Sequence, residues 1–149
     1  MSDRSAQEQS GELVSIAMAT YNGARYVRDQ IESLLAQDYP IHEIVVCDDG
    51  SQDGTLDILR EYESPSFRVF LNESNLGFIK NFEKACGLCE GDYIALCDQD
   101  DVWTTNKIST LVEFMQSRGL SGAFSDAFLV DAEGETLNLS LWDLSLIHI

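Results

Sequence analysis

The segment CDQDDVW, residues 97–103, carries three carboxylates within four positions: Asp98, Asp100 and Asp101. The whole chain is acidic, with 26 Asp and Glu against 9 Lys and Arg and a formal net charge of −17. Carboxylates packed this closely repel one another and resist ionisation. Three explanations are open: a helix cap or solvated turn, an acid–base pair, or a site for a hard divalent cation. The acidity favours the third, because Mg²⁺ and Mn²⁺ prefer carboxylate oxygen.

A divalent cation would let this acidic protein bind a phosphate ligand. The ion offsets the repulsion between the carboxylates, recruits a diphosphate and stabilises the charge that builds on a leaving phosphate. We therefore expect Mn²⁺ or Mg²⁺ as the cofactor. The same acidity argues against direct binding of nucleic acid, which requires Lys and Arg to displace counterions.

Short apolar runs alternate with helical patterns along the 149 residues, a length that suits one domain. The runs predict buried strands at 13–19, 43–47, 67–71, 92–97 and 122–131. Apolar residues at helical spacing predict helices at 24–37 and around Leu59, Ala85 and Val112. Four strand–helix alternations are typical of an α/β fold with a mostly parallel sheet flanked by helices.

Polar clusters follow three of the predicted strands: TYN at 20–22, DDG at 48–50 and DQDD at 98–101. Open parallel sheets bind ligands outside the carboxyl ends of their strands, so the three clusters should form one site. The DDG segment has two equal interpretations, a simple turn or a carboxylate that accepts hydrogen bonds from a base or ribose. Tyr21 could stack on a planar base, while Asn22 and Gly23 could only form the turn into the helix.

Three segments, agreeing in order and spacing, resemble the family 2 glycosyltransferases of GT-A fold. They are VSIAMATYNGARYVRDQIESLLAQDYPIHEIVVCDDGSQDGT, NLGFIKNFEKA and GDYIALCDQDDVW, and the resemblance covers Leu13 to about Asp131. It implies a Rossmann-like nucleotide-diphospho-sugar transferase that passes a sugar to an acceptor hydroxyl, with metal dependence and usually with inversion. DQDDVW followed by SDAFLVD is similar to the branch identified as rhamnosyltransferases and related cell-surface polysaccharide enzymes.

The resemblance also implies roles for single residues. The segment Ala19–Tyr21 would line the nucleotide base, Asp49 would contact the base ring, and Lys80 would assist at the base or phosphate. For the acidic loop, Asp101 is favoured for the metal and Asp100 for ribose or metal, with Asp98 in support. The implied nucleotide-sugar site is Ala19, Thr20, Tyr21, Asp49, Lys80, Asp98 and Asp100, and the implied metal ligands are Asp100 and Asp101.

The ends of the chain depart from the family pattern. Residues 1–12 predict a disordered polar leader, and 132–149 a truncated or non-family tail. The family's general base, an Asp or Glu, belongs to a later half that no segment after Asp131 matches, so the catalytic residue stays unassigned. The acidic residues there without the expected context are Asp126, Asp131, Glu133, Glu135 and Asp143. An alternative is therefore a donor-binding fragment without activity.

Other classes fit the residues less well. A Mg²⁺-dependent phospho-acceptor signalling domain needs its acidic pair after the first strand, whereas here the pair follows the second. A nucleotidyltransferase needs a Gly-rich basic loop that TYNGARY does not supply. The C-x-x-C of Cys86 and Cys89 lacks a second ligand pair for zinc, so we expect two buried cysteines on a helix face.

The expected location follows from what the sequence lacks. There is no basic and apolar signal region and no apolar run of the roughly 18 residues that a transmembrane helix needs. We expect a cytoplasmic protein, with peripheral binding at the inner face of the membrane as a further option. The expected partners are a nucleotide-diphosphate sugar donor and a saccharide or lipid-linked saccharide acceptor.

Overall fold

The computed structural model describes residues 11–131 and 134–144. The predicted leader, residues 1–12, therefore lies outside the described residues except for its last two positions, and the end of the predicted tail, 145–149, lies outside them as well. The chain divides into two compact units, residues 1–107 and 108–149, which are described separately.

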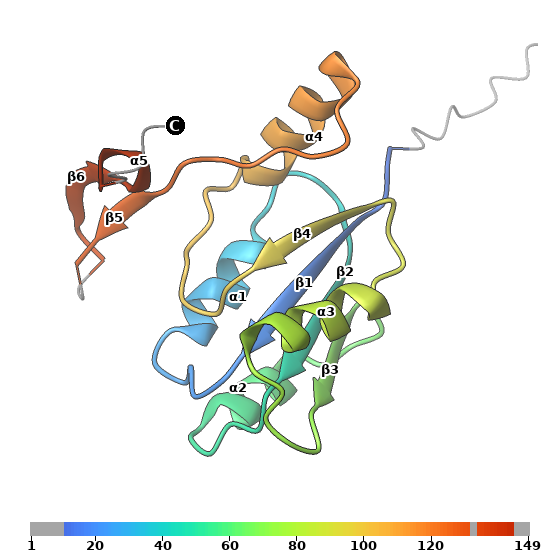
Figure 1. Ribbon diagram of the computed structural model, residues 1–149, viewed down its shortest axis with the longest axis vertical. Coiled ribbons are helices and arrows are strands. Elements are labelled where there is room, and N and C mark those ends of the chain that lie inside the picture. The colour runs from blue at the N-terminus through green and yellow to red at the C-terminus, as the bar shows by residue number, and fades with distance from the viewer. Residues whose placement is uncertain (1–10, 132–133, 145–149) are drawn as a thin grey trace, which may run out of the picture. The chain divides into compact units, whose positions relative to one another are not determined.

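A four-stranded sheet forms the centre of the first unit. Its strands are β1 (Val14–Thr20), β2 (Ile41–Asp48), β3 (Phe67–Leu71) and β4 (Tyr93–Cys97). Their order is β3-β2-β1-β4, and every neighbouring pair runs parallel (Figure 1). The predicted α/β fold with a mostly parallel sheet is confirmed.

Three helices connect the strands: α1 (Val27–Leu35), α2 (Thr55–Glu61) and α3 (Phe78–Leu88). The connections through α1 and α2 step from β1 to β2 to β3, whereas α3 returns the chain across the sheet to β4. Because crossover connections are right-handed, that reversal puts α3 on the opposite face from α1 and α2. Helix α3 contacts β1 and β2, and α1 contacts α2 (Figure 1).

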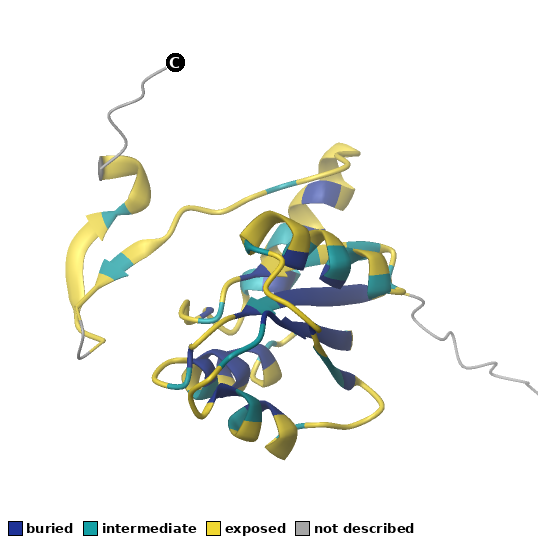
Figure 2. Cartoon of the chain, turned by 60° about the horizontal axis from the view of Figure 1, so that its bottom comes forward, coloured by how far each residue is buried: buried dark blue, intermediate teal, exposed yellow. Residues whose placement is uncertain are grey.

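The core lies in the two central strands, as Figure 2 shows by the dark blue of β1 and β2. Both strands are covered on both faces, which is why their sequences are continuous apolar runs rather than alternating ones. On the α3 face Ala17, Cys47 and Ala85 pack together. Cys86 and Cys89 pack beside them but are only partly buried, whereas the sequence predicted two buried cysteines on a helix face; all four cysteines are free thiols.

A buried carboxylate organises the amino-terminal edge of the sheet. Glu43, at the start of β2, accepts hydrogen bonds from the Ser15 hydroxyl at 2.8 Å and from the backbone amide of Glu90. It also pairs with Arg68, whose guanidinium donates to the carbonyl of Leu88 at 2.7 Å. These contacts fix the chain between α3 and β4 against the sheet.

Helix α4 spans Lys107–Arg118, so its first residue belongs to the first unit and the rest of it to the second. The second unit also holds β5 (Phe128–Val130), β6 (Thr136–Ser140) and the short α5 (Leu141–Leu144). β5 is shorter than the strand predicted at 122–131. β6 pairs antiparallel with it and was not predicted. No helix among the described residues is both long and apolar enough to span a membrane.

Candidate functional site

A cavity of about 420 Å³ opens where the carboxyl ends of β1, β2 and β4 meet the loop that follows β3. Six of the residues predicted for the nucleotide-sugar site line it: Ala19, Thr20, Tyr21, Asp49, Asp98 and Asp100. The other lining residues, which were not among the predicted site residues, are Asn75, Gly77, Phe78, Asn81 and Gln99. The parallel sheet thus brings the three polar strand ends together, as expected.

Asp48, the first acid of the DDG segment, holds two strand ends together. Its carboxylate accepts the Thr20 hydroxyl at 2.7 Å and the backbone amides of Gly50 and Ser51 at 3.1 and 2.8 Å. Gly50 has a φ of 84°, which glycine adopts without strain. Asp48 is fully buried and faces its own turn, so the turn interpretation of DDG fits this residue.

Asp49, the second acid, lines the cavity and orders the loop after β3. Its carboxylate accepts hydrogen bonds from the side-chain amide of Asn72 and the backbone amides of Leu76 and Gly77, at 2.7, 2.7 and 2.8 Å. Burial favours the protonated form, but these amides and the charge of Lys84 outweigh it and lower the pKa of Asp49. Asp49 is therefore a fixed anion whose Oδ2 accepts only one of these bonds.

A chain of amides supports this carboxylate from helix α3. The Asn72 amide also donates to Oδ1 of Asn81 at 2.8 Å, and Asn81 donates to the carbonyl of Cys47 at 2.8 Å. Lys84 donates to Oδ1 of Asn72 at 2.7 Å. The predicted basic residue, Lys80, is exposed on α3 and is not among the residues that line the cavity. Lys84, one helical turn further along, is the basic group that reaches the Asp49 network.

Tyr21 lines the cavity, and half of the residue is exposed. The Gln99 side chain binds both backbone polar groups of Tyr21: it accepts a hydrogen bond from the Tyr21 amide at 2.9 Å and donates one to the Tyr21 carbonyl at 3.1 Å. No sequence pattern had identified Gln99, which lies between two of the acids predicted to bind the donor.

The acidic loop is fixed at both ends but not uniformly directed into the cavity. Asp98 and Asp100 line the cavity, whereas Asp101 does not and lies near Lys107 and Cys97, whose pKa values it influences. Partial loss of hydration, together with repulsion from Asp101 and Asp100, raises the pKa of Asp98. Beyond the acids, the backbone amide of the buried Trp103 donates to the Ser33 hydroxyl on α1 at 3.1 Å.

The donor set suits Mg²⁺ or Mn²⁺ if a ligand completes the coordination. Among residues 11–131 and 134–144, no cluster of three or more His, Cys, Asp and Glu side chains could hold a metal ion alone. The carboxylate oxygens of Asp98 and Asp100 are nevertheless of the type these ions prefer. The residues that line the cavity include three acids and no Lys or Arg, so a diphosphate there requires a cation between itself and the protein.

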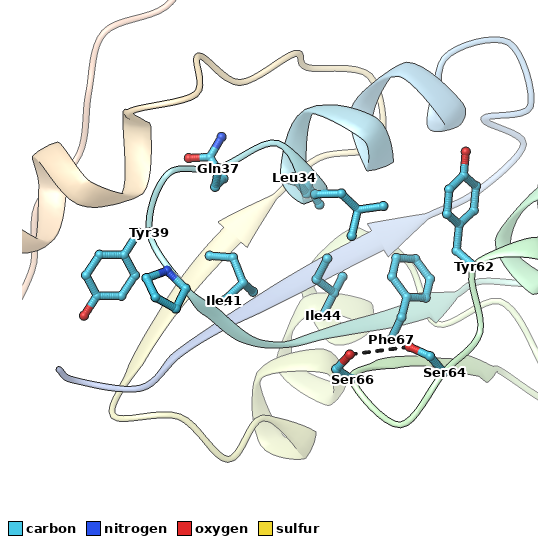
Figure 3. Close-up of a pocket in the computed structure, with 11 residues that line it drawn as sticks. Leu34, Gln37, Tyr39, Ile41, Ile44, Tyr62, Ser64, Ser66 and Phe67 are labelled. Atoms are coloured by element: carbon cyan, nitrogen blue, oxygen red, sulfur yellow. Dashed lines mark hydrogen bonds between the residues drawn. The ribbon is translucent and has the colours of Figure 1, made fainter. Parts of the chain in front are cut away.

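A second hollow of about 330 Å³ lies at the other end of the strands (Figure 3). It is formed by the end of α1, the start of β2 and the start of β3, with Leu34, Ile41, Ile44 and Phe67 among its walls. None of its lining residues carries a formal charge, and its polar groups include the hydroxyls of two serines, Ser64 and Ser66. Because it has no carboxylate to bind a cation and no charged group to balance a phosphate, the acidic cavity is the candidate site.

Three acids of the second unit, Asp126, Asp131 and Asp143, accept hydrogen bonds from backbone amides of the same unit. Asp126 accepts the backbone amides of Ala127 and Trp142, and Asp143 accepts the amide of Ser140. Asp131 accepts the amide of Glu135 in the turn between β5 and β6. Glu133 lies outside the described residues. None of these contacts identifies a general base, so the catalytic residue stays unassigned.

Comparisons with known proteins agree on one family. The model of glycosyl transferase family 2 matches residues 15–142. The putative teichuronic acid biosynthesis glycosyltransferase TuaG of Bacillus subtilis is 35% identical over 128 residues, which is 85% of this chain and 51% of the relative. An Escherichia coli enzyme, UDP-Glc:alpha-D-GlcNAc-diphosphoundecaprenol beta-1,3-glucosyltransferase WfaP, is 35% identical over 118 residues, 79% of this chain and 47% of the relative. The chain thus spans about half the length of these curated relatives.

Solved structures show the same fold. Residues 1–349 of Staphylococcus aureus TarS in complex with UDP match with a TM-score of 0.66 and 29% identity, over 72% of this chain and 33% of the other. The mannosyltransferase PcManGT of Pyrobaculum calidifontis, in complex with GDP-Man and Mn²⁺, matches with a TM-score of 0.63 and 23% identity, over 72% and 33%. The fold is that of the GT-A glycosyltransferases, and the chain belongs to glycosyl transferase family 2.

Proposed function

We propose that this chain binds the donor of a metal-dependent glycosyltransferase, which transfers a sugar from a nucleotide diphosphate to an acceptor hydroxyl in cell-surface polysaccharide biosynthesis. One observation carries the proposal. A single cavity joins a half-exposed aromatic ring, a fixed carboxylate and an acidic loop, without any Lys or Arg in its lining. That arrangement suits a planar base at one end and a cation-bridged diphosphate at the other.

The residues have separate tasks in donor binding. Tyr21 offers its ring to the base, and Asp49 offers Oδ2 as an acceptor for an N–H of the base. Asp98 and Asp100 face the ribose and the diphosphate, and Asp100, with Asp101 as the other candidate, would hold Mn²⁺ or Mg²⁺. When bound, the ion neutralises charge on the departing diphosphate.

The proposed reaction is a single in-line displacement with inversion. An acceptor oxygen attacks the anomeric carbon as the nucleoside diphosphate leaves, through a transition state of oxocarbenium character. A general base must remove the acceptor proton. Because none is identified among the described residues, the second candidate is a donor-binding module that requires further sequence for transfer. The assignment to the rhamnosyltransferase-like branch stays a prediction.

The relatives support the substrate class. The TarS complexes contain UDP and UDP-GlcNAc, and the name of WfaP gives a UDP-glucose donor and a diphosphoundecaprenol-linked acceptor. We therefore propose a uridine diphosphate sugar as the first donor to test and a lipid-linked saccharide as the acceptor, used on the cytoplasmic side of the membrane.

Calorimetric titration with UDP, GDP and dTDP, in Mn²⁺ and in EDTA, tests the proposal. We expect one nucleoside diphosphate to bind in Mn²⁺ and not in EDTA, and to bind much more weakly to the Asp100→Ala and Asp101→Ala variants. Equal binding in EDTA would overturn the cation-bridged site. Release of UDP from a UDP-sugar in the presence of acceptor then separates a transferase from a donor-binding module.

A further inference from the structure

We infer that Gln99 is a positioning residue of the donor site: its side-chain amide substitutes for a peptide group and extends the pairing of β1 with β4 beyond the strands. The inference rests on the proposed function and adds a residue to it. Gln99 would act through Tyr21, by holding the backbone of the base platform at a fixed place relative to the acidic loop.

The backbone pairing shows why a substitute is needed. β1 and β4 pair in parallel from Val14↔Tyr93 to Met18↔Cys97, and the pairing ends there. β1 runs on to Thr20 against β2, so its side toward β4 lacks a strand partner beyond Met18. The Gln99 amide supplies an acceptor to the Tyr21 N–H at 2.9 Å and a donor to the Tyr21 carbonyl at 3.1 Å, as a neighbouring strand would do.

Gly23 provides the room for this amide. A Cβ built on Gly23 would lie 2.2 Å from Oε1 and 2.5 Å from Cδ of Gln99, well inside contact distance. The backbone gives no other reason for glycine, since the φ of Gly23 lies outside the positive range that only glycine adopts readily. The space left by the absent side chain is therefore filled by Gln99.

The arrangement joins two parts of the site that are 78 residues apart in sequence. Gln99 lies between Asp98 and Asp100, so a shift of the acidic loop would move its amide, which is bound to the backbone N–H and C=O of Tyr21. The Gln99 side chain therefore sets the distance between Tyr21, which is proposed to bind the base, and the acidic loop, which is proposed to bind the cation and diphosphate. Preorganisation of this kind lowers the cost of ordering the site when a donor binds.

The first test needs no ligand. Amide hydrogen exchange of Tyr21 is measured by NMR in the 149-residue chain and in Gln99→Ala, Gly23→Ala and the double variant, with Gln52→Ala as the matched control because Gln52 is an exposed glutamine on a neighbouring loop. We expect roughly tenfold faster exchange in each single variant, from the loss of about one net hydrogen bond, and no acceleration in Gln52→Ala. Unchanged exchange in Gln99→Ala would overturn the inference.

The second test compares ligands. Gln99→Ala should weaken UDP·Mn²⁺ roughly tenfold and uridine by a smaller factor, because uridine carries no diphosphate and depends less on the distance between Tyr21 and the acidic loop. Gly23→Ala should weaken binding in the wild-type background and have no further effect in the Gln99→Ala background. A loop that is merely destabilised would show additive losses instead, which would count against a positioning role.

The outcomes separate the two proposals. A wild-type chain that binds no nucleoside diphosphate overturns the proposed function, whatever the exchange rates show. If wild type binds UDP but Gln99→Ala binds it equally tightly, the role of Gln99 is overturned and the proposed function is not. Urea unfolding of each variant verifies that the measured proteins are folded.

Discussion

The side-chain amide of Asn72 donates a hydrogen bond of 2.7 Å to Oδ1 of Asp49. The contact joins the residue after β3 to the residue after β2, so two strand ends share one carboxylate. The backbone amides of Leu76 and Gly77 bind the same carboxylate and bring the loop before α3 over the cavity. Asp49 is thus an anion on which the shape of the site depends, as well as a candidate contact for the base.

Replacing Asp49 with Asn should destabilise the protein in a pH-dependent way. The variant places an NH₂ group against amide donors, and we expect a loss of about 2 kcal/mol in the free energy of unfolding at pH 7. The pKa of Asp49 is lowered in the folded chain, so its contribution is complete above the unfolded value, about 3.9, and declines as pH falls through the folded value.

Urea unfolding of wild type and Asp49→Asn at pH 7, 5 and 3 measures this difference. It should be the same at pH 7 and 5 and smaller at pH 3. The exposed Asp38 provides the control, since Asp38→Asn should have little effect at any of the three values. A difference that grew toward pH 3 would contradict the lowered pKa.

Gly77 should tolerate no side chain, because its backbone φ and ψ angles are ones that only glycine adopts without strain. It precedes α3 with φ 80° and ψ 163°, and its amide binds Asp49. We expect Gly77→Ala to cost roughly 1–3 kcal/mol of unfolding free energy and to weaken nucleotide binding by displacing the loop. Thermal and urea unfolding, followed by UDP titration, would measure both effects.

Gly87 is the matched control for that substitution. It lies within α3, has no positive φ, and a Cβ there would meet no atom within 4 Å. Gly87→Ala should therefore stabilise the protein by roughly 0.5–1 kcal/mol, since alanine loses less backbone entropy in a helix. If both alanine variants changed stability in the same direction, the strain assigned to Gly77 would be wrong.

The sheet and the convergence of its polar ends follow from patterns that are local in sequence. β1 and β2 are recognisable because strands buried on both faces are continuous apolar runs, and parallel pairing then places Thr20 beside Asp48. β6 alternates polar and apolar residues as TLNLS, but it is only five residues long and almost wholly exposed, so the alternation is too short to distinguish a strand from a loop. A further short-range signal is the turn at Gly134, with φ 85°, between it and β5.

The supporting residues of the site could not be predicted because their roles depend on distances across the fold. Asn72 and Asn81 are ordinary polar residues in the sequence. Only the structure shows that they form a chain of hydrogen bonds from Asp49 to the carbonyl of Cys47. Lys80 and Lys84 both lie on α3, one turn apart, and no pattern decides which one faces the site. Gln99 likewise has a role that depends on Tyr21, which is 78 residues away in sequence.

Glu43 should be far more sensitive to substitution than an exposed acid in a similar pair. It is 5% exposed and bound by Ser15, Arg68 and the Glu90 amide. Glu43→Gln removes the closer carboxylate paired with Arg68 and leaves the more distant Glu90, at 3.9 Å, and we expect a loss of about 3 kcal/mol in unfolding free energy. Burial raises the pKa of Glu43, but its donors lower it overall, so this stabilisation too should decline in acid as pH falls through the folded value.

The Arg28–Glu61 pair provides the comparison, because both of its side chains are about half exposed. Glu61→Gln should change the urea midpoint much less than Glu43→Gln does, since water and salt screen the pair. The two variants are measured at pH 7 in low and high salt. Similar losses in both would mean that burial of Glu43 does not set its contribution.

The four thiols should be unreactive in the folded protein. Burial raises the pKa of Cys97 to about 12 and that of Cys89 to about 11, and it also raises those of Cys47 and Cys86. Because the thiolate is the reactive form, iodoacetamide at pH 8 should modify the native chain slowly and the urea-unfolded chain rapidly at all four positions. Mass spectrometry of timed samples reports this, and rapid native labelling of Cys86 or Cys89 would contradict it.

Asp100 and Asp101 should differ in their effect on metal-dependent binding. The sequence favoured Asp101 as the metal ligand, but Asp100 lines the cavity whereas Asp101 lies near Lys107, which competes for its charge. We therefore expect Asp100→Asn to weaken UDP binding in Mn²⁺ by tenfold or more, roughly the effect of one lost charged contact, and Asp101→Asn to weaken it less. Titrations with UDP and uridine in Mn²⁺ measure both, and the difference between the two variants should be smaller for uridine, which carries no diphosphate. A larger loss in Asp101→Asn would mean that Asp101 is the metal ligand, as the sequence predicted. The acidic loop would then have to turn when the donor binds.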